Sequence, residues 1–450
     1  MSVQQIFFLL VLFGVSILGF KLYGRIYRNI RLARKYQGAP DRSKRWRNVL
    51  LVAFGQRKMF KNLIPAFLHL FIYIAFLFTQ IELIEILIDG IFGVHRFFAS
   101  YLGLFYTLII NVIEVLSLLA LVGTVIFLWR RNLLHVSRFE NPEMTGWPKR
   151  DANLILLGEI LLITGIFTMN GADALLQNID PQHYPDTGNL VISAGLGPLL
   201  FSGFDQSTLV FLERTGWWLH ILVVFGFLLY LPVSKHLHIL LAFPNTYFAR
   251  QHSNGKMNNM PEIMQEVKSM LGMGDPVESA TEIPEFGVSD IRDLTWKNLL
   301  DAYTCTECGR CTAVCPANLT GKKLSPRKIM MDVRDRVEEV SEKLRSADPK
   351  WIDETKKEGH PDLKIHNFND GKSLFEYISK EELHACTTCN ACVEACPVLI
   401  NPLEIILEMR RYEILTQGSG PQDWLPMFTS LENSGSVWQV NTERDAWIDR

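Results

Sequence analysis

Cysteine is absent from almost the whole of this 450-residue chain, because all eight cysteines stand in two short segments, 305–315 and 386–396. The disulfide frameworks of small secreted proteins do not space their thiols in this way. Thiols that are kept for metal ligation indicate a reducing compartment. The sequence therefore excludes a disulfide-stapled secreted protein and predicts that the cysteine-bearing half lies in the cytoplasm.

Long hydrophobic runs are absent from residues 251–450, whereas residues 1–245 contain several runs of about 20 or more apolar residues. About 20 helical residues cross the ~30 Å hydrocarbon core of a bilayer. The first half is therefore predicted to be a membrane domain and the second a soluble one. This division excludes a purely cytosolic enzyme and a disordered chain. The net charge of −2 excludes little by itself.

Several common signatures of function are also missing. The sequence has no G-x-G-x-x-G fingerprint and no P-loop, so no nucleotide or flavin site is predicted. No Ser/His/Asp constellation is recognisable, and no nucleic-acid partner is expected. The chemistry must come from the cysteines and from histidines and carboxylates in the membrane half.

Five membrane spans are predicted, near residues 3–23, 63–88, 101–129, 152–176 and 211–240. The segment 21–61 carries thirteen Lys/Arg and one acid, Asp41, and the loop 130–151 carries five Lys/Arg. The other two connections carry one each. Because cytoplasmic loops are rich in Lys and Arg, the N-terminus is predicted outside and the C-terminal half inside. The first span lacks a basic start and a small-residue cleavage site, so it is interpreted as an anchor.

Histidines inside the spans are unexpected and therefore informative. His220 and His238 stand eighteen residues apart in the fifth span, which in a continuous helix places them on one face, about 27 Å apart. His69 in the second span lies at a depth similar to that of His238. A histidine pair from two facing helices commonly holds a b-type haem, and we expect His69 and His238 to bind one. The alternative for each is a hydrogen-bonded interfacial residue.

A second haem has weaker support. His220 would be one of its ligands, but the second span has Thr79 at the matching depth. His95 in the outer loop, or a methionine, could replace the missing histidine, or no second haem exists. The sequence therefore predicts one or two haems. His236 is expected to point away from His220 and to lie at the surface or behind a ligand.

Two carboxylates are expected deep in the membrane half, Glu114 midway along the third span and Glu159 inside the fourth. Buried carboxylates are costly unless they are paired or protonated. One interpretation is a proton path to a quinone site. The other is a hydrogen bond to a neighbouring helix through Asn111 or Asn170, and both stay open. Three acids at the outer end of the second span are interpreted as its solvated terminus: Glu82, Glu85 and Asp89.

Both cysteine segments have the pattern C-x2-C-x2-C-x3-C-P, which ligates clusters in two-cluster ferredoxins. Three close cysteines bind one cubane and the fourth reaches the other cluster. The first predicted 4Fe–4S ligand set is Cys305, Cys308, Cys311 and Cys396. The second is Cys386, Cys389, Cys392 and Cys315. Zinc is the rival metal, but structural zinc sites prefer cysteine pairs separated by a longer span.

The predicted fold class is all-α, with a five-helix transmembrane bundle followed by a mostly helical ferredoxin-like domain that holds two 4Fe–4S clusters. Segments such as 328–344, between the two cysteine runs, have helical periodicity and few strand signals. Trp424, Trp438 and Trp447 indicate either partner docking or ordinary packing of the tail. The predicted domains are a transmembrane domain, a linker or docking segment, a cluster domain and a tail: 1–245, 246–296, 297–412 and 413–450.

Two stretches resemble known families. The stretch Tyr-Leu-Pro-Val-Ser-Lys-His-Leu-His at 230–238, followed by Pro-Asn at 244–245, resembles the membrane cytochrome b subunits of respiratory nitrate reductase (gamma subunit) and heterodisulfide reductase. The stretch Thr-Glu-Cys-Gly-Arg-Cys at 306–311, with Cys-Pro-Ala at 315–317 and Leu-Ser-Pro at 324–326, resembles the C-type iron–sulfur subunit of heterodisulfide reductase.

The resemblance implies a cytochrome b-like domain in a bacterial or archaeal cytoplasmic membrane. It implies that His69 and His238 hold the haem on the cytoplasmic side and that His220 holds an outer haem. Relatives that reduce disulfides or oxidise organic acids often carry cysteine-rich CCG-type modules. None is present in this sequence, so the catalytic centre is expected on another subunit.

The sequence and the resemblance together predict a membrane-anchored electron-transfer subunit of an oxidoreductase complex. It would link the quinone pool, menaquinone or ubiquinone, to a cytoplasmic redox subunit that carries CCG-type modules, through b haem and two clusters. Membrane lipid is the remaining expected partner. Two alternatives stay open: a self-contained quinone-linked oxidoreductase of a small substrate, and a redox-sensing iron–sulfur membrane protein.

Overall fold

The computed structural model describes residues 2–36, 38, 41–253, 255–273, 285–346, 348–351, 368–438 and 448. These residues form helices and loops, and their only extended pairing is one isolated bridge between Arg34 and Thr295. The chain divides into two compact units. The membrane unit comprises residues 1–29, 41–247 and 303–309, and the iron–sulfur unit comprises residues 30–40, 248–302 and 310–450. The predicted all-α fold class is confirmed.

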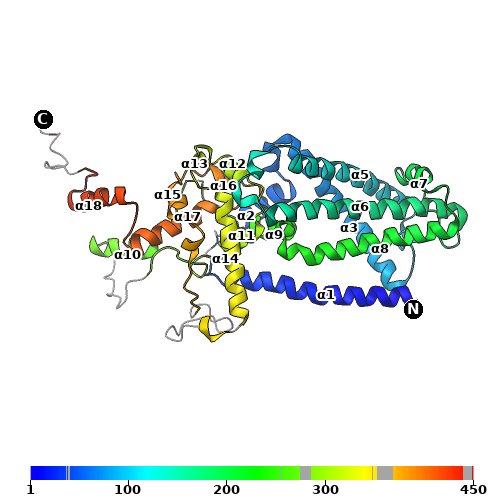
Figure 1. Cartoon of the computed structure of the whole chain (residues 1–450), viewed down its shortest axis with the longest axis horizontal. Helices are drawn as coiled ribbons and strands as arrows, with labels where there is room; N and C mark the ends of the chain where they lie inside the picture. The colour runs from blue at the N-terminus through cyan, green and yellow to red at the C-terminus, as the bar shows by residue number, and fades with distance from the viewer. Residues whose placement is uncertain are drawn as a thin grey trace. The chain divides into compact units, whose positions relative to one another are not determined.

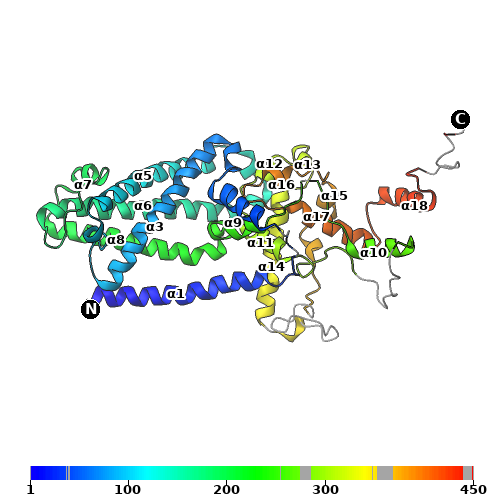
Figure 2. The same cartoon turned by 180° about the vertical axis from the view of Figure 1, so that it is seen from behind.

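Five helices of the membrane unit are long and apolar enough to cross a bilayer, as predicted. They lie side by side in both views (Figures 1 and 2). Their bounds are Val3–Ile30 (α1), Leu63–Phe92 (α3), Leu104–Asn132 (α5), Trp147–Ile179 (α6) and Gln206–Tyr230 (α8). Shorter helices join or follow them: Arg42–Asn48 (α2), Ala99–Leu102 (α4), Ser193–Phe201 (α7) and His238–Tyr247 (α9).

Small residues allow α6 and α8 to approach each other closely. A Cβ atom on Gly216 would lie 2.7 Å from the carbonyl oxygen of Gly165, so a larger residue cannot occupy this position without separating the helices. Close approach at small residues is a common way of packing helices in a bilayer, where hydrophobic burial gives little driving force. The buried face of α8 is therefore fixed against α6 on either side of this crossing.

The fifth span is not one continuous helix, and the prediction that His220 and His238 share a helical face is wrong. The helix α8 ends at Tyr230, two single 3₁₀ turns follow at 231–233 and 235–237, and α9 begins at His238. Pro232 has no N–H to donate to the carbonyl of Leu228. The hydroxyl of Tyr23 donates to that carbonyl instead, at 2.8 Å.

Asp151 holds the backbone that follows this break. Its carboxylate accepts hydrogen bonds from the Tyr230 hydroxyl (2.6 Å), the Ser234 hydroxyl (2.8 Å) and the backbone N–H of Lys235 (3.1 Å). Asp151 is buried at the start of α6. The turn between α8 and α9 is therefore a fixed structure and not a frayed helix end.

The iron–sulfur unit is built around α14 (Pro326–Ser346), which confirms the helix predicted for 328–344. Its apolar face, including Val333 and Val337, is buried, and α17 (Pro402–Arg411) packs against it with Ile405 and Met409 buried. The other helices are Pro261–Met270 (α10), Trp296–Thr304 (α11), Arg310–Ala313 (α12), Pro316–Leu319 (α13), Lys380–His384 (α15), Ala391–Ala395 (α16) and Leu425–Ser434 (α18).

Arg336 on α14 is a fully buried cation that joins distant segments of the iron–sulfur unit. Its guanidinium donates to both carboxylate oxygens of Asp290 (3.0 and 2.7 Å) and of Asp370 (2.7 and 2.9 Å). Burial would raise the pKa of Asp370, but the hydrogen bonds from Arg336 and Lys343 lower it below its ordinary value. Asp290 lies within the predicted linker, whose neighbours Val288 and Ile291 are also buried.

We expect Arg336→Met to destabilise the iron–sulfur unit by about 3–5 kcal/mol, because Asp290 and Asp370 would keep their charges without a partner. The matched control is Lys323→Met, which breaks an exposed pair with Glu381 and should cost less than about 1 kcal/mol. The measurement is thermal unfolding of the full chain, followed by loss of cluster absorbance. Equal shifts of the unfolding midpoint in the two variants would contradict this role of Arg336.

Candidate metal centres

The two cysteine runs share one backbone conformation. The third residue of each run, Glu307 and Thr388, has φ of 54° and 55°, and the fifth, Gly309 and Asn390, has φ of 70° and 63°. Left-handed conformations are uncommon for residues other than glycine. Backbones that alternate in this way turn successive N–H groups inward and form the concavities of many Fe–S sites. The second run therefore repeats the first in shape as well as in sequence.

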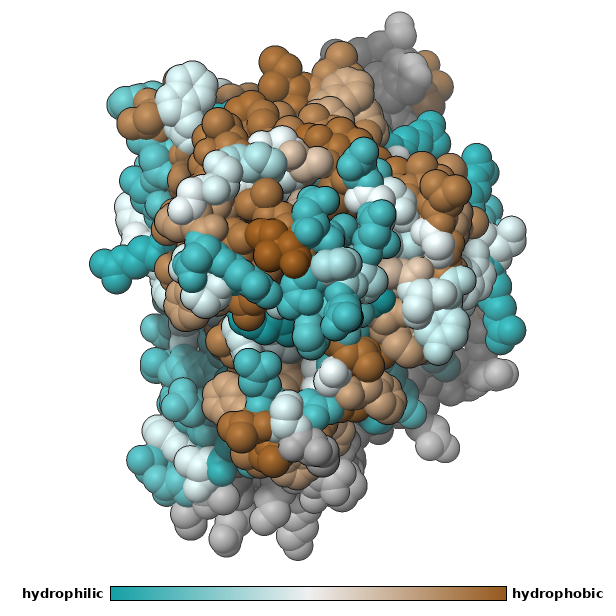
Figure 3. Space-filling model, turned by 90° about the vertical axis from the view of Figure 1, so that its right-hand side faces the viewer, coloured by the Kyte–Doolittle hydropathy of each residue, from teal (hydrophilic) through white to brown (hydrophobic). Residues whose placement is uncertain are grey.

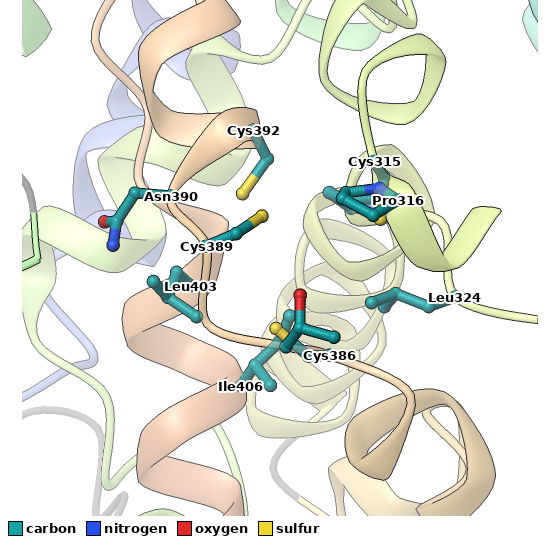
Figure 4. Close-up of a pocket in the computed structure, with 11 residues that line it drawn as sticks. Cys315, Pro316, Leu324, Cys386, Cys389, Asn390, Cys392, Leu403 and Ile406 are labelled. Carbon is teal, nitrogen blue, oxygen red and sulfur yellow. The ribbon is translucent and has the colours of Figure 1, made fainter. Parts of the chain in front are cut away.

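The second run lines a pocket together with one cysteine of the first. The sulfurs of Cys386, Cys389 and Cys392 surround this pocket, and Cys315 and Pro316 lie on its opposite side (Figure 4). The structure thus brings together the four residues of the second predicted ligand set. Three apolar residues also line the pocket: Leu324, Leu403 and Ile406.

The thiols of this pocket are arranged for a metal cluster. Burial raises the pKa of Cys392 to about 12, and the neighbouring Cys386 and Cys315 add to the shift. Iron binds thiolates, so loading of the pocket must release protons from these groups. The backbone N–H of Thr388 donates to the sulfur of Cys386 at 3.4 Å. Hydrogen bonds to ligand sulfurs are one of the means by which proteins set cluster potentials.

The cysteines of the first predicted set are divided between the two units. Cys305 and Cys308 belong to the membrane unit, whereas Cys311 and Cys396 belong to the iron–sulfur unit. Within the iron–sulfur unit, α12 carries Cys311 and packs against α16, which ends at Cys396. Joint ligation by these four residues stays a prediction.

Glu307, between Cys305 and Cys308, forms a buried ion pair that the sequence did not indicate. Its carboxylate lies 2.5 Å from the ammonium of Lys235, and the two side chains are 3% and 10% exposed. Lys235 also donates to the carbonyl of Pro148 at 2.6 Å. Burial lowers the pKa of Lys235, whereas the charges of Glu307 and Asp151 oppose that shift. The turn after α8 is therefore joined to the segment that carries Cys305 and Cys308.

The break after α8 gathers histidines that a continuous helix would separate. The rings of His236 and His238 lie 5.6 Å apart, so His236 does not point away as predicted. Burial lowers the pKa of His236 to about 3, and His238 and His69 lower it further. Burial also lowers the pKa of His238, whose Nδ1 lies 3.2 Å from the carbonyl of Lys235. Neutral imidazoles are the form that binds a metal, so these residues fit a haem.

The support for a second haem does not increase. His220 is buried, with its Nδ1 3.4 Å from the carbonyl of Leu162. Both ring nitrogens of His95 are engaged, Nε2 with Asp173 at 2.9 Å and Nδ1 with the guanidinium of Arg214 at 3.3 Å. The expectation that His95 could replace a missing ligand is therefore wrong in this conformation.

The two membrane carboxylates differ in their surroundings. Glu114 is fully buried and accepts hydrogen bonds from the Asn170 side chain (3.3 Å), the backbone N–H of Ile192 (2.9 Å) and both the N–H and hydroxyl of Ser193. The expected contact with Asn170 is thus present. Glu159 is half-buried, and no hydrogen bond to it is found among the described residues. Neither contact pattern decides whether these groups carry protons.

The acids at the end of α3 are not solvated, contrary to the prediction. Glu82 and Glu85 are almost completely buried, and Asp89 is only 8% exposed. The loop after α3 turns back into the bundle, so that Arg96 donates to the side chains of Asn170 (2.5 Å) and Asp173 (3.2 Å). A buried cation in a loop leaves no periodic signal, and for this reason the sequence did not reveal it.

The tail is packed in part. The ring of Trp424 lies 5.0 Å from that of His384 in an edge-to-face arrangement, which favours ordinary packing for this residue. Trp438 is 77% exposed. Trp447 lies outside the described residues.

Comparison with known proteins identifies the cluster domain. Residues 304–400 match the family described as 4Fe-4S dicluster domain. The chain is 28% identical, over 93% of its length, to a Bacillus subtilis protein described as a probable iron-sulfur-binding oxidoreductase, FadF. It is 25% identical, over 95% of its length, to the EtfAB:quinone oxidoreductase of Syntrophomonas wolfei. The chain covers 57% and 55% of these relatives, a little over half of their length.

A third relative belongs to the dihydromethanophenazine:CoB–CoM heterodisulfide reductase of Methanosarcina acetivorans. One polypeptide of that enzyme is 28% identical to this chain, over 32% of this chain and 31% of the relative. Heterodisulfide reductase is thus among the relatives, as the resemblance implied. The cytochrome b resemblance stays a prediction. No solved structure matches the chain. A dicluster domain and iron–sulfur oxidoreductase relatives support a general role in electron transfer.

Exchange of ligands between the two runs gives a specific test. We expect Cys315→Ser and Cys389→Ser to change the same cluster signal in electron paramagnetic resonance, because both residues line one pocket, and each to lower the iron content by about four per chain. Cys396→Ser, the matching position of the second run, should change the other signal. If Cys315→Ser instead changed the signal that Cys308→Ser changes, the predicted ligand sets would be wrong.

Proposed function

We propose that this chain is a membrane-anchored electron-transfer subunit that links the quinone pool to a soluble redox partner. Three observations support the proposal: five helices suited to a bilayer, a two-cluster domain, and relatives that are iron–sulfur oxidoreductases. The haem and the clusters, when bound, supply one-electron carriers, and the protein supplies their ligands and spacing.

The contact that carries the proposal is the one between Lys235 and Glu307. Glu307 stands between two cysteines of the first run, and the carbonyl of Lys235 lies 3.2 Å from the Nδ1 of His238. An ion pair and a short stretch of backbone therefore connect a candidate haem ligand with two candidate cluster ligands. A protein that only anchored a ferredoxin to the membrane would have no need for this connection.

The ligands follow from the same geometry. We assign His69 and His238 to a b haem, with His236 beside both rings. The Lys235 carbonyl next to Nδ1 of His238 favours the tautomer that leaves Nε2 free for iron, as is usual for metal-binding histidines. The clusters take the two predicted cysteine sets. His220 is kept as a candidate ligand of a second haem only.

The exposed side of the second cluster pocket is the natural entry for a soluble partner. Cys389 is exposed, whereas Cys315 and Cys392 are buried. The Syntrophomonas relative is named for EtfAB and a quinone. We propose the same two classes of partner for this chain, a soluble redox protein at the iron–sulfur unit and menaquinone or ubiquinone at the membrane unit. The orientation proposed from the basic loops places the iron–sulfur unit in the cytoplasm.

We expect His69→Ala and His238→Ala each to remove the b-haem α-band, because each deletes one of two axial ligands. The measurement is a dithionite-reduced minus oxidised spectrum of anaerobically purified protein, with haem and iron quantified. Iron should stay at about eight per chain in both variants. His183→Ala is the matched control, since His183 is a 76% exposed histidine of the same unit. A full α-band in His69→Ala and His238→Ala would overturn the haem assignment.

A further inference from the structure

Glu82 is a buried carboxyl without a hydrogen-bond donor. It lies on α3 and is 1% exposed. Both of its carboxyl oxygens are buried, and neither accepts a hydrogen bond from any of the residues that the structure describes. In this respect it differs from every other carboxyl near it.

The neighbouring carboxyls are all supplied with donors. Glu85 accepts from the Tyr106 hydroxyl and from the backbone N–H of Phe98, both at 2.8 Å. Asp89 accepts from the backbone N–H groups of Arg96 and Phe97. Glu114, as described above, accepts four hydrogen bonds. These three side chains are therefore held as acceptors, which suits the ionised form.

The charges around Glu82 also disfavour a negative charge on it. The charged groups that act on it are Arg96, in the loop after α3, Glu85 on α3 and Glu114 on α5. The positive charge of Arg96 is already directed at Asp173 on α6. On the sides of α1 and α8, aromatic residues pack around the neighbouring Ile86, including Phe8 and Trp217.

An ionised carboxylate in such a place costs several kcal/mol, because it has lost water and gained no donor. A group in this position takes up a proton instead. The nearest polar side chains lead from Glu85 and Arg96 to Asp173 and His95, and His95 is 18% exposed. Figure 3 looks onto the end of the membrane unit at which the N-terminus and α7 lie, and hydrophilic residues gather at its centre.

We propose that Glu82 is a proton-binding site inside the membrane unit, whose carboxyl is protonated at neutral pH and exchanges its proton with solvent. The reaction is the transfer of one proton between the Glu82 carboxylate and hydronium or water. A carboxyl of this kind can store a proton for a quinone, which takes up two protons on reduction and releases them on oxidation. The site itself does not depend on that proposed function.

Infrared spectroscopy of the full chain in lipid nanodiscs tests this site directly, because a protonated carboxyl has a carbonyl stretch that a carboxylate lacks. We expect a band that moves to lower frequency in D₂O and is lost in Glu82→Gln, which replaces the neutral carboxyl by a neutral amide of the same size. The matched control is Glu114→Gln, which changes a carboxyl of the same unit that has four donors, and this variant should keep the band. Glu159→Gln identifies any band from Glu159.

A second measurement needs no variant. In the wild-type protein the band should persist between about pH 6 and about pH 8, well above the range in which an ordinary glutamate is protonated. The proposal is overturned if Glu82→Gln keeps the full band, if Glu114→Gln removes it, or if the wild-type protein has no such band at about pH 7. Neither measurement involves haem or quinone, so a negative result here would leave the proposed electron-transfer function unaffected.

Discussion

The buried ion pair between Lys235 and Glu307 is the constraint on which the arrangement of candidate redox ligands depends. A pair with both side chains at most 10% exposed is stable only when both charges stay matched, so neither segment can move away without leaving a charge unpaired. The turn after α8 carries Lys235, His236 and His238, and the segment 303–309 carries Cys305 and Cys308. The pair therefore fixes candidate haem ligands and candidate cluster ligands within one unit.

This constraint requires the fifth span to end early. Pro232 interrupts the helix, Tyr23 satisfies the carbonyl that the proline leaves, and Asp151 accepts three hydrogen bonds from the turn. A straight helix would place His236 and His238 on different faces and would direct Lys235 elsewhere. The interruption thus brings two histidines and one lysine to a single place. Irregular backbone near a membrane surface is acceptable here because side chains satisfy its polar groups.

The sequence was sufficient for the parts of the fold that have a period or a motif. Five apolar runs gave five helices, the segment 328–344 gave α14, and the spacing of the cysteines gave the dicluster domain. The conformation at Glu307 and Thr388 repeats because the two motifs repeat. It was not sufficient for the membrane carboxylates, since solvation of Glu82, Glu85 and Asp89 depends on a loop that folds back with Arg96. It also missed the effect of Pro232, although the proline was visible, because the apolar run continues through it.

Reoxidation of the reduced protein by quinone tests the central claim most directly. The full chain in nanodiscs would be reduced with dithionite, freed of excess reductant and mixed with a water-soluble quinone, while the clusters are followed by electron paramagnetic resonance. If membrane and iron–sulfur units form one electron path, both clusters are reoxidised in the wild-type protein, and their reoxidation is strongly slowed in His238→Ala and unchanged in His183→Ala. Equal rates in the wild-type and His238→Ala proteins would contradict the account, because the clusters would then react with quinone without the histidine site.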